Sequence, residues 1–251
     1  MTRLFLLCFF LITLGSSGQE KNSAFKDGEL LKYRIHYGVV NAGYATLGVN
    51  ENENQYHFIG KGWTVGMANW FFKVKDQYES YVDKSNELPV HFIRNVNEGG
   101  YKINRDIYFD HTENKALVED HKRKTSKEYK IDSIQDLISA FYKLRNSPID
   151  TMSIGGSVEM DLFIDGETFP FKLVLLGKDK ISSKFGKIPC YKFRPFVQSG
   201  RVFKEEESLT IWISADKNKI PVRVKASLAV GSLKMDLTRY EGLSHSFAEK
   251  L

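Results

Sequence analysis

The sequence predicts a mainly β protein: a curved antiparallel sheet or an incomplete β-barrel, with one principal α-helix packed against it. Three observations lead to this fold class. Apolar and polar residues alternate with a period of two along most of the chain, turn-forming residues separate these segments at short spacing, and only one segment has helical spacing. Because no helices alternate with the predicted strands, we expect consecutive strands to pair in an antiparallel meander.

Two of the clearest strands lie near the two ends of the chain. Alternation of apolar and polar residues is typical of an antiparallel sheet with one buried and one solvated face. The apolar members are Leu31, Tyr33, Ile35, Tyr37 and Val39 in the first segment, and Val222, Val224, Ala226, Leu228 and Val230 in the second. We expect these side chains to share the buried face.

A β-hairpin is predicted around Asp165 and Gly166, a pair that favours a tight two-residue turn. Residues 158–164 alternate before this pair, and residues 169–175 alternate after it. Further turns are expected at residues 98–100, 110–114 and 216–219, where glycine and short polar residues gather.

The single helix is predicted over about residues 133–146. Ser133 can serve as its N-cap, Asp136 provides a variant of the capping box, and Pro148 ends the element. Because the helix has one apolar stripe, it should lie against the sheet, between a β lobe of about residues 25–131 and another of about residues 155–242.

Residues 1–18 have the features of a cleavable secretory signal peptide. Arg3 precedes an apolar run of eleven residues, and small residues follow at positions 15–18. The run is shorter than the roughly 20 residues that a membrane-spanning helix needs, and no later segment comes closer. Cys8 lies within the run, without the setting of a lipid-modified cysteine. We therefore expect residues 19–251 to form a single β-rich domain with no transmembrane anchor, exported to the periplasm or, alternatively, outside the cell.

The composition of the mature chain also limits its partners. Cys190 is its only cysteine, so no internal disulfide can form, and its place in a predicted strand indicates a buried, inert thiol. The net charge of +5 is too small to indicate a nucleic-acid partner. The densest basic cluster, residues 121–124, suits a solvated strand face, although an anionic lipid or glycan is an alternative partner.

No sequence pattern indicates catalysis or a cofactor. The six histidines show no pair at metal-ligand spacing, and no glycine-rich phosphate loop or exposed-nucleophile motif is present. We expect the acidic residues to lie at solvated strand edges and in turns. We therefore expect no catalytic residues, no metal and no cofactor.

One segment, residues 63–72, is unusually rich in aromatic residues and follows neither a strand nor a helix pattern. Large aromatic and methionine side chains line ligand cavities or form lids over them, but they also fill ordinary cores. The candidate lining residues are Trp63, Met67, Trp70, Phe71 and Phe72.

Several segments together resemble the exported bacterial family called domain of unknown function 3108. They are GELLKY at 28–33, NAGYA at 41–45, FKVKD at 72–76, DLISAFYKLR at 136–145, and LTIWIS at 209–214 followed by IPVR at 220–223. The resemblance implies an exported envelope protein and carries no catalytic residues. More remotely, the repeated strands that open with apolar-Pro-Val are similar to LolA/LolB-type lipoprotein carriers, whose curved sheet wraps helices around an apolar cavity.

Two functional hypotheses follow. In the first, the chain is a non-enzymatic envelope protein that binds an apolar or amphiphilic ligand, such as a lipid or lipoprotein acyl chain, on the concave side of the sheet. In the second, it is an interaction or assembly protein of the envelope with no small-molecule ligand. An enzyme acting on a surface glycan is a more distant third.

Overall fold

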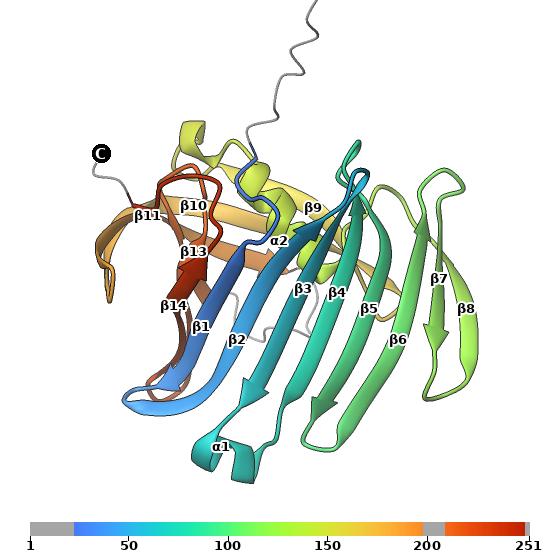
Figure 1. Ribbon diagram of the computed structural model, residues 1–251, viewed down its shortest axis with the longest axis horizontal. Coiled ribbons are helices and arrows are strands. Elements are labelled where there is room, and N and C mark those ends of the chain that lie inside the picture. The colour runs from blue at the N-terminus through green and yellow to red at the C-terminus, as the bar shows by residue number, and fades with distance from the viewer. Residues whose placement is uncertain (1–22, 198–208, 249–251) are drawn as a thin grey trace, which may run out of the picture.

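The computed structural model describes residues 23–197 and 209–248, so the predicted signal peptide lies outside the described residues. Within these ranges the chain forms one fourteen-stranded antiparallel sheet (Figure 1). The strands are β1 Leu30–Tyr37, β2 Val40–Glu51, β3 Gln55–Thr64, β4 Lys75–Asp83, β5 Pro89–Glu98, β6 Tyr101–Asp110, β7 Lys115–Asp120, β8 Thr125–Lys130, β9 Ser157–Ile164, β10 Glu167–Ser183, β11 Gly186–Val197, β12 Leu209–Ser214, β13 Pro221–Ser227 and β14 Ser232–Glu241. No helix among the described residues is long and apolar enough to cross a bilayer.

The sheet consists of two meanders joined by the first and last strands. β1 to β8 follow one another in space, β9 to β14 do the same, and β1 pairs with β14 in a register that places Tyr37 opposite Leu233. β8 and β9 are therefore the two free edges, and hydrogen bonds between strands do not close the sheet into a barrel. Side chains bridge the opening, because Asp165 in the β9–β10 turn pairs with Arg94 and Arg105 on β5 and β6. The predicted fold class, an open curved antiparallel sheet, is confirmed.

The principal helix, α2 (Leu137–Asn146), lies on the concave side of this sheet (Figure 1). Tyr142 stacks on Phe58 with 3.8 Å between ring centroids. Ile138 approaches β3 so closely that a Cβ at Gly60 would lie 2.9 Å from its Cδ1 atom, so a larger residue at this position would displace the Ile138 side chain. Ordinary core side chains thus fill the space between α2 and the sheet. The curved sheet with a helix on its concave side agrees with the likeness to lipoprotein carriers, whereas the apolar cavity of those carriers is not part of this packing.

The helix begins about one turn later than predicted. Asp136, rather than Ser133, is the N-cap: its carboxylate accepts hydrogen bonds from the backbone N–H groups of Ile138 and Ser139, both at 2.8 Å. Ser139 completes the capping box by accepting from the Asp136 backbone N–H at 2.9 Å. Ser133 has a positive φ of 45°, which is incompatible with the start of a helix.

Several strand boundaries also differ from the prediction. The Asp165–Gly166 hairpin turn is confirmed, with positive φ at both residues. β1 and β13, however, end before the last residues of their apolar patterns, so Val39, Leu228 and Val230 lie in turns and are exposed. The basic cluster at residues 121–124 forms the β7–β8 turn rather than a strand face.

Candidate functional site

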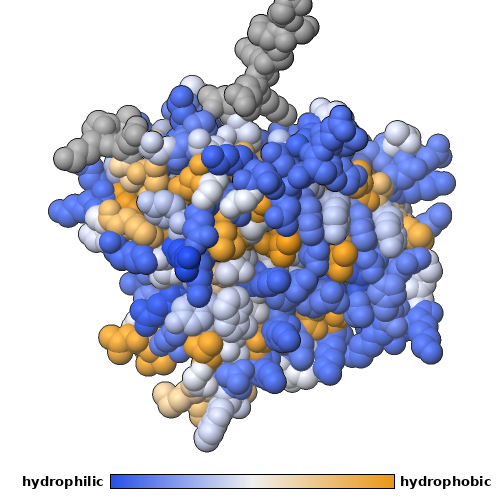
Figure 2. Space-filling view, viewed as in Figure 1, coloured by the Kyte–Doolittle hydropathy of each residue, from blue (hydrophilic) through white to orange (hydrophobic). Residues whose placement is uncertain are grey.

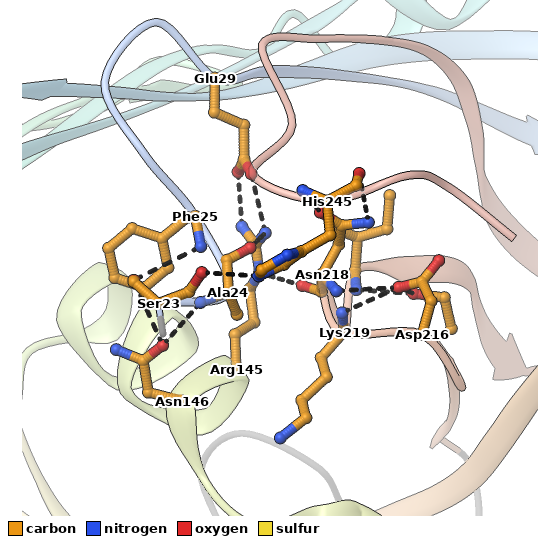
Figure 3. Close-up of polar contacts among 12 residues, drawn as sticks. Ser23, Ala24, Phe25, Glu29, Arg145, Asn146, Asp216, Asn218, Lys219 and His245 are labelled. Atoms are coloured by element: carbon orange, nitrogen blue, oxygen red, sulfur yellow. Dashed lines mark hydrogen bonds and ion pairs between the residues drawn. The ribbon is translucent and has the colours of Figure 1, made fainter. Parts of the chain in front are cut away.

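A buried polar network surrounds the C-terminal end of α2 (Figure 3). The Arg145 guanidinium donates to both carboxylate oxygens of Glu29, at 2.5 and 2.8 Å, and both side chains are shielded from solvent. It also donates to the carbonyl oxygens of Ala24 and Asn218. Burial alone would lower the pKa of Arg145, but the hydrogen bond and charge of Glu29 raise that pKa overall, so the guanidinium stays charged.

The same network joins chain segments that are distant in sequence. The Asn218 side chain donates to the carbonyls of His245 and Ser246 and accepts from the His245 N–H, while Asn146 accepts from the Ala24 N–H (Figure 3). These contacts fasten residues 23–25, the β12–β13 turn and the segment after β14 to α2. Because the network is internally bonded and buried, its role is structural.

The aromatic segment predicted as a ligand site forms a short helix, α1 (Gly66–Phe71), between β3 and β4. It lies at one end of the sheet rather than over the concave side (Figure 1). None of its residues is buried: Trp70 is 90% exposed, Phe71 87% and Met67 66%, and the adjoining Phe72 is 54% exposed. Trp63 lies apart from them, half-buried on β3 with its ring 6.0 Å from that of Tyr44.

Hydrogen bonds and one close ring contact hold α1 in place. Thr64 Oγ1 accepts from the Val74 N–H at 2.8 Å and donates to the Phe72 carbonyl at 3.2 Å. These bonds join the end of β3 to the residues that follow α1. The Phe72 ring packs on the β5–β6 turn, where a Cβ at Gly99 would lie 2.4 Å from a ring carbon. The exposed aromatic side chains are therefore presented on a fixed support.

A groove of about 830 Å³ lies beside α1 and runs across β3, β4, β5 and β6. Strand alternation places Phe58, Phe92 and Ile107 toward α2 and the core, so the side chains of the intervening positions point to the opposite, outer face. The outward-pointing lining residues are Lys61, Trp63, Lys75, Gln77, Asn95, Asn97, Lys102, Asn104 and His121, and Asn69 and Lys73 reach the groove from α1 and its connection. The groove and the exposed aromatic segment are thus contiguous.

The groove offers cationic, amide and aromatic groups. Lys61, Lys73, Lys75 and Lys102 form no ion pair with any described residue, which leaves their charges available to an anion. Asp76 is the acidic residue of the lining; it accepts from the Asn97 N–H at 2.9 Å and hydrogen-bonds Glu98, whose pKa is raised by burial and then by Asp76. This chemistry suits an anionic or polyhydroxylated head group.

Other chemistry-bearing residues have structural settings. The Cys190 thiol is 1% exposed, and burial raises its pKa to about 12, which confirms the expectation of a buried cysteine and opposes nucleophilic reactivity. No group of three or more His, Cys, Asp or Glu side chains in the described part of the chain is arranged to hold a metal ion. His91 and His121 both contact the Asp106 carboxylate on the outer face.

Sequence reasoning found α1 but missed most of the groove. Among the predicted lining residues only Trp63 belongs to it, while the amides and lysines come from four strands. Asn95 and Asn97 lie at alternate positions in one strand, which is a usable signal, but their neighbours depend on the pairing register of β4, β5 and β6. That register depends on the geometry of the connecting turns as well as on the spacing within each strand.

Comparisons with known proteins give a family and a fold. The family model described as "Protein of unknown function (DUF3108)" matches residues 32–238. A search of curated proteins finds no match. Among solved structures, a beta-barrel-like protein of domain of unknown function DUF1849 from Brucella abortus aligns with a TM-score of 0.60 at 10% identity, covering 88% of this chain and 100% of that one.

Two further structures have lower similarity. A protein from Bacteroides fragilis, described as a candidate exported protein with a YmcC-like fold, has a TM-score of 0.34 and 9% identity over 86% of this chain and 97% of its own. A protein from Parabacteroides distasonis, described as a candidate lipoprotein, has a TM-score of 0.35 and 10% identity over 87% and 98%. At these identities, the similarity of the Brucella protein supports the fold alone.

Proposed function

The chain belongs to the DUF3108 family of proteins of unknown function, and on this premise we propose that it is an exported, non-enzymatic envelope protein that binds an amphiphilic ligand. The α1 segment contacts the apolar part of the ligand, and the adjoining groove receives its head group. A lipid or the acylated end of a lipoprotein has this chemistry. The ligand is thus held at one end of the sheet and on its outer face, rather than on the concave side.

One observation carries this proposal: four large apolar side chains are exposed next to a groove whose lysines form no ion pair with any described residue. Met67, Trp70, Phe71 and Phe72 are all more than half exposed, although apolar side chains of this size contribute most to stability when they are buried. Clustered exposure of this kind marks an interaction site in a soluble protein. The lysines beside them favour a ligand with an anionic group next to its apolar part.

The first test asks whether the protein carries a lipid. The full chain is expressed so that it can be exported, and the exported protein is purified, measured by native mass spectrometry and extracted for lipids. We expect a bound species of lipid mass that organic extraction removes. A consistently empty protein in a stoichiometric complex with another envelope protein would instead support the assembly hypothesis.

The second test measures binding directly with dispersed dihexanoyl-phosphatidylglycerol. Trp70 is an intrinsic reporter because its exposed indole should shift its emission to shorter wavelength when the apolar part of the probe covers it. Phe71→Ser should weaken binding by about tenfold, because most of an aromatic contact is lost. Ile154→Ser is the matched control, since Ile154 is 73% exposed but lies outside α1 and the groove. Equal binding by both variants, or no emission shift in the parent protein, would reject the proposal.

A further inference from the structure

The antiparallel meander places alternate turns at the same end of the sheet. The turns β1–β2, β5–β6, β7–β8 and β13–β14 lie at the end where α1 connects β3 to β4 (Figure 1). We call this the apolar end, made of residues 37–40, 65–74, 98–101, 121–124 and 228–233. The opposite end, with the turns β2–β3, β4–β5 and β6–β7, is the polar end.

Exposed hydrophobic side chains concentrate at the apolar end. Fourteen large hydrophobic side chains of the described residues are exposed, and all except Leu30, Tyr108 and Ile154 lie in these turns. The turn residues are Tyr37, Val39, Val40, Met67, Trp70, Phe71, Phe72, Tyr101, Leu228, Val230 and Leu233. Figure 2 shows hydrophobic residues at the lower left of the molecule, over the β1–β2 turn, and hydrophilic residues over the upper turns. The apolar surface therefore extends well beyond α1.

Neighbouring turns at this end are fastened to one another. The Tyr37 hydroxyl donates to the Val230 carbonyl at 2.9 Å and links the β1–β2 turn to the β13–β14 turn. The Val65 N–H donates to the Ala42 carbonyl at 3.0 Å and links α1 to β2. Phe72 packs on Gly99 and links α1 to the β5–β6 turn. The apolar side chains are thus presented together by one connected support.

Positive charge accompanies the apolar side chains. The β7–β8 turn exposes Lys122, Arg123 and Lys124, and the groove with its lysines adjoins α1 through Asn69 and Lys73. Arg123 approaches Asp120 at 3.9 Å, while Lys124 has no ion pair within the described ranges. The end therefore combines protruding aliphatic and aromatic tips with a basic surround.

We infer that the apolar end docks the protein on an anionic lipid surface. Aromatic side chains beside Lys and Arg are typical of protein segments at the boundary between acyl chains and head groups. Each basic residue adds favourable binding free energy at a negatively charged surface. A protein partner would also bury the apolar side chains, but the basic residues around them favour a surface rich in anionic groups. The inference rests on the proposed function in one respect, since α1 serves both the single ligand and the lipid surface.

The experiment compares co-sedimentation with vesicles of phosphatidylcholine and with vesicles that also contain phosphatidylglycerol. We expect binding to the anionic vesicles, weak binding to phosphatidylcholine alone, and release by high salt. Val39→Asp with Val230→Asp should weaken vesicle binding by at least about tenfold, because two exposed apolar side chains are replaced by negative charges. Both residues lie in turns outside α1. Lys122→Glu and Lys124→Glu should each weaken vesicle binding by about fivefold or more at low salt.

Ile154→Asp is the matched control, because it makes the same kind of change at an exposed residue outside the apolar end. Circular dichroism verifies that every variant is folded. Absence of binding to anionic vesicles, or equal losses in the Ile154 variant and the Val39–Val230 variant, would overturn the inference. The single-ligand proposal is judged separately: the Val39–Val230 variant should still bind dispersed dihexanoyl-phosphatidylglycerol, whereas Phe71→Ser should lose both activities.

Discussion

The two ends of the sheet differ in what their turn residues do. At the polar end, short polar side chains bond the backbone of their own turn: Asn52 accepts from the N–H groups of Asn54 and Gln55, and Asp110 accepts from those of Thr112 and Glu113. Such bonds stabilise turns and explain the residue types found there. The described turns of this end expose no large hydrophobic side chain.

At the apolar end, the β1–β2, β5–β6 and β13–β14 reversals use glycines with positive φ, such as Gly38 and Gly231. The β7–β8 turn is the exception, because Asp120 accepts from the Arg123 N–H. Val39 is 93% exposed and Val230 77%, and neither side chain contributes to the core. Turn formation therefore explains the residue types at the polar end but not at the apolar end. This difference between the two ends supports the proposal that the apolar end contacts a lipid surface.

The largest effect should come from the buried ion pair between Glu29 and Arg145, at the C-terminal end of α2. Glu29→Gln leaves Arg145 charged and buried without its carboxylate, which should lower the free energy of unfolding by about 3–5 kcal/mol. Urea denaturation measures the loss. The control is Glu159→Gln, which breaks an exposed pair with Lys172 and should leave the free energy of unfolding nearly unchanged. Similar losses in the two variants would contradict a structural role for the Arg145 network.

A second, pH-dependent effect should arise at Asp136, the buried N-cap of α2. Burial raises its pKa from 3.8 to about 6, despite the opposing hydrogen bonds from Ser80 and the backbone. A carboxyl whose pKa is raised on folding contributes stability below pH 4 that is lost as the pH rises to about 6. The interval corresponds to about 3 kcal/mol at most.

Asp136→Asn should remove this dependence while keeping an oxygen that accepts from the Ile138 and Ser139 N–H groups. The difference in unfolding free energy between the variant and the parent protein should therefore shift in favour of the variant between pH 4 and pH 6.5. Using this difference cancels the carboxylates that titrate in both proteins, such as Asp236, whose pKa is lowered by its hydrogen bonds to Arg223 and His36 against the effect of burial. A constant difference across this range would contradict the raised pKa.

Local patterns were enough to predict the fold class. Period-two alternation, the Asp165–Gly166 turn and the single helical stripe depend on neighbouring residues, and all three appear in the structure. The pairing of β1 with β14 joins residues about 200 positions apart, and the Glu29–Arg145 pair joins residues 116 apart. No local spacing encodes such contacts, so neither could be predicted.

The candidate site was predictable only in part, for a related reason. The apolar alternation of the first strand continues to Val39, and that of the β13 segment continues to Val230, so pattern alone assigned both residues to the buried face. The structure shows that the strands end earlier. Val39 and Val230 instead lie in turns beside Gly38 and Gly231, where they are exposed. The aromatic content of residues 63–72 was a direct signal, whereas the groove lysines required the strand register.

The smallest effect on stability should come from α1 itself. Trp70→Ala and Phe71→Ala remove two side chains that are 90% and 87% exposed, so the free energy of unfolding should change by less than about 0.5 kcal/mol for each. Thermal or urea unfolding checks this, with Ile154→Ala as the control for loss of an exposed side chain. A loss of several kcal/mol would mean that these aromatic residues are buried in solution, as a core or an interface between copies. A negligible loss of stability combined with weakened lipid binding would distinguish the two ends. Substitutions in α1 would then lower lipid binding alone, whereas Glu29→Gln lowers stability.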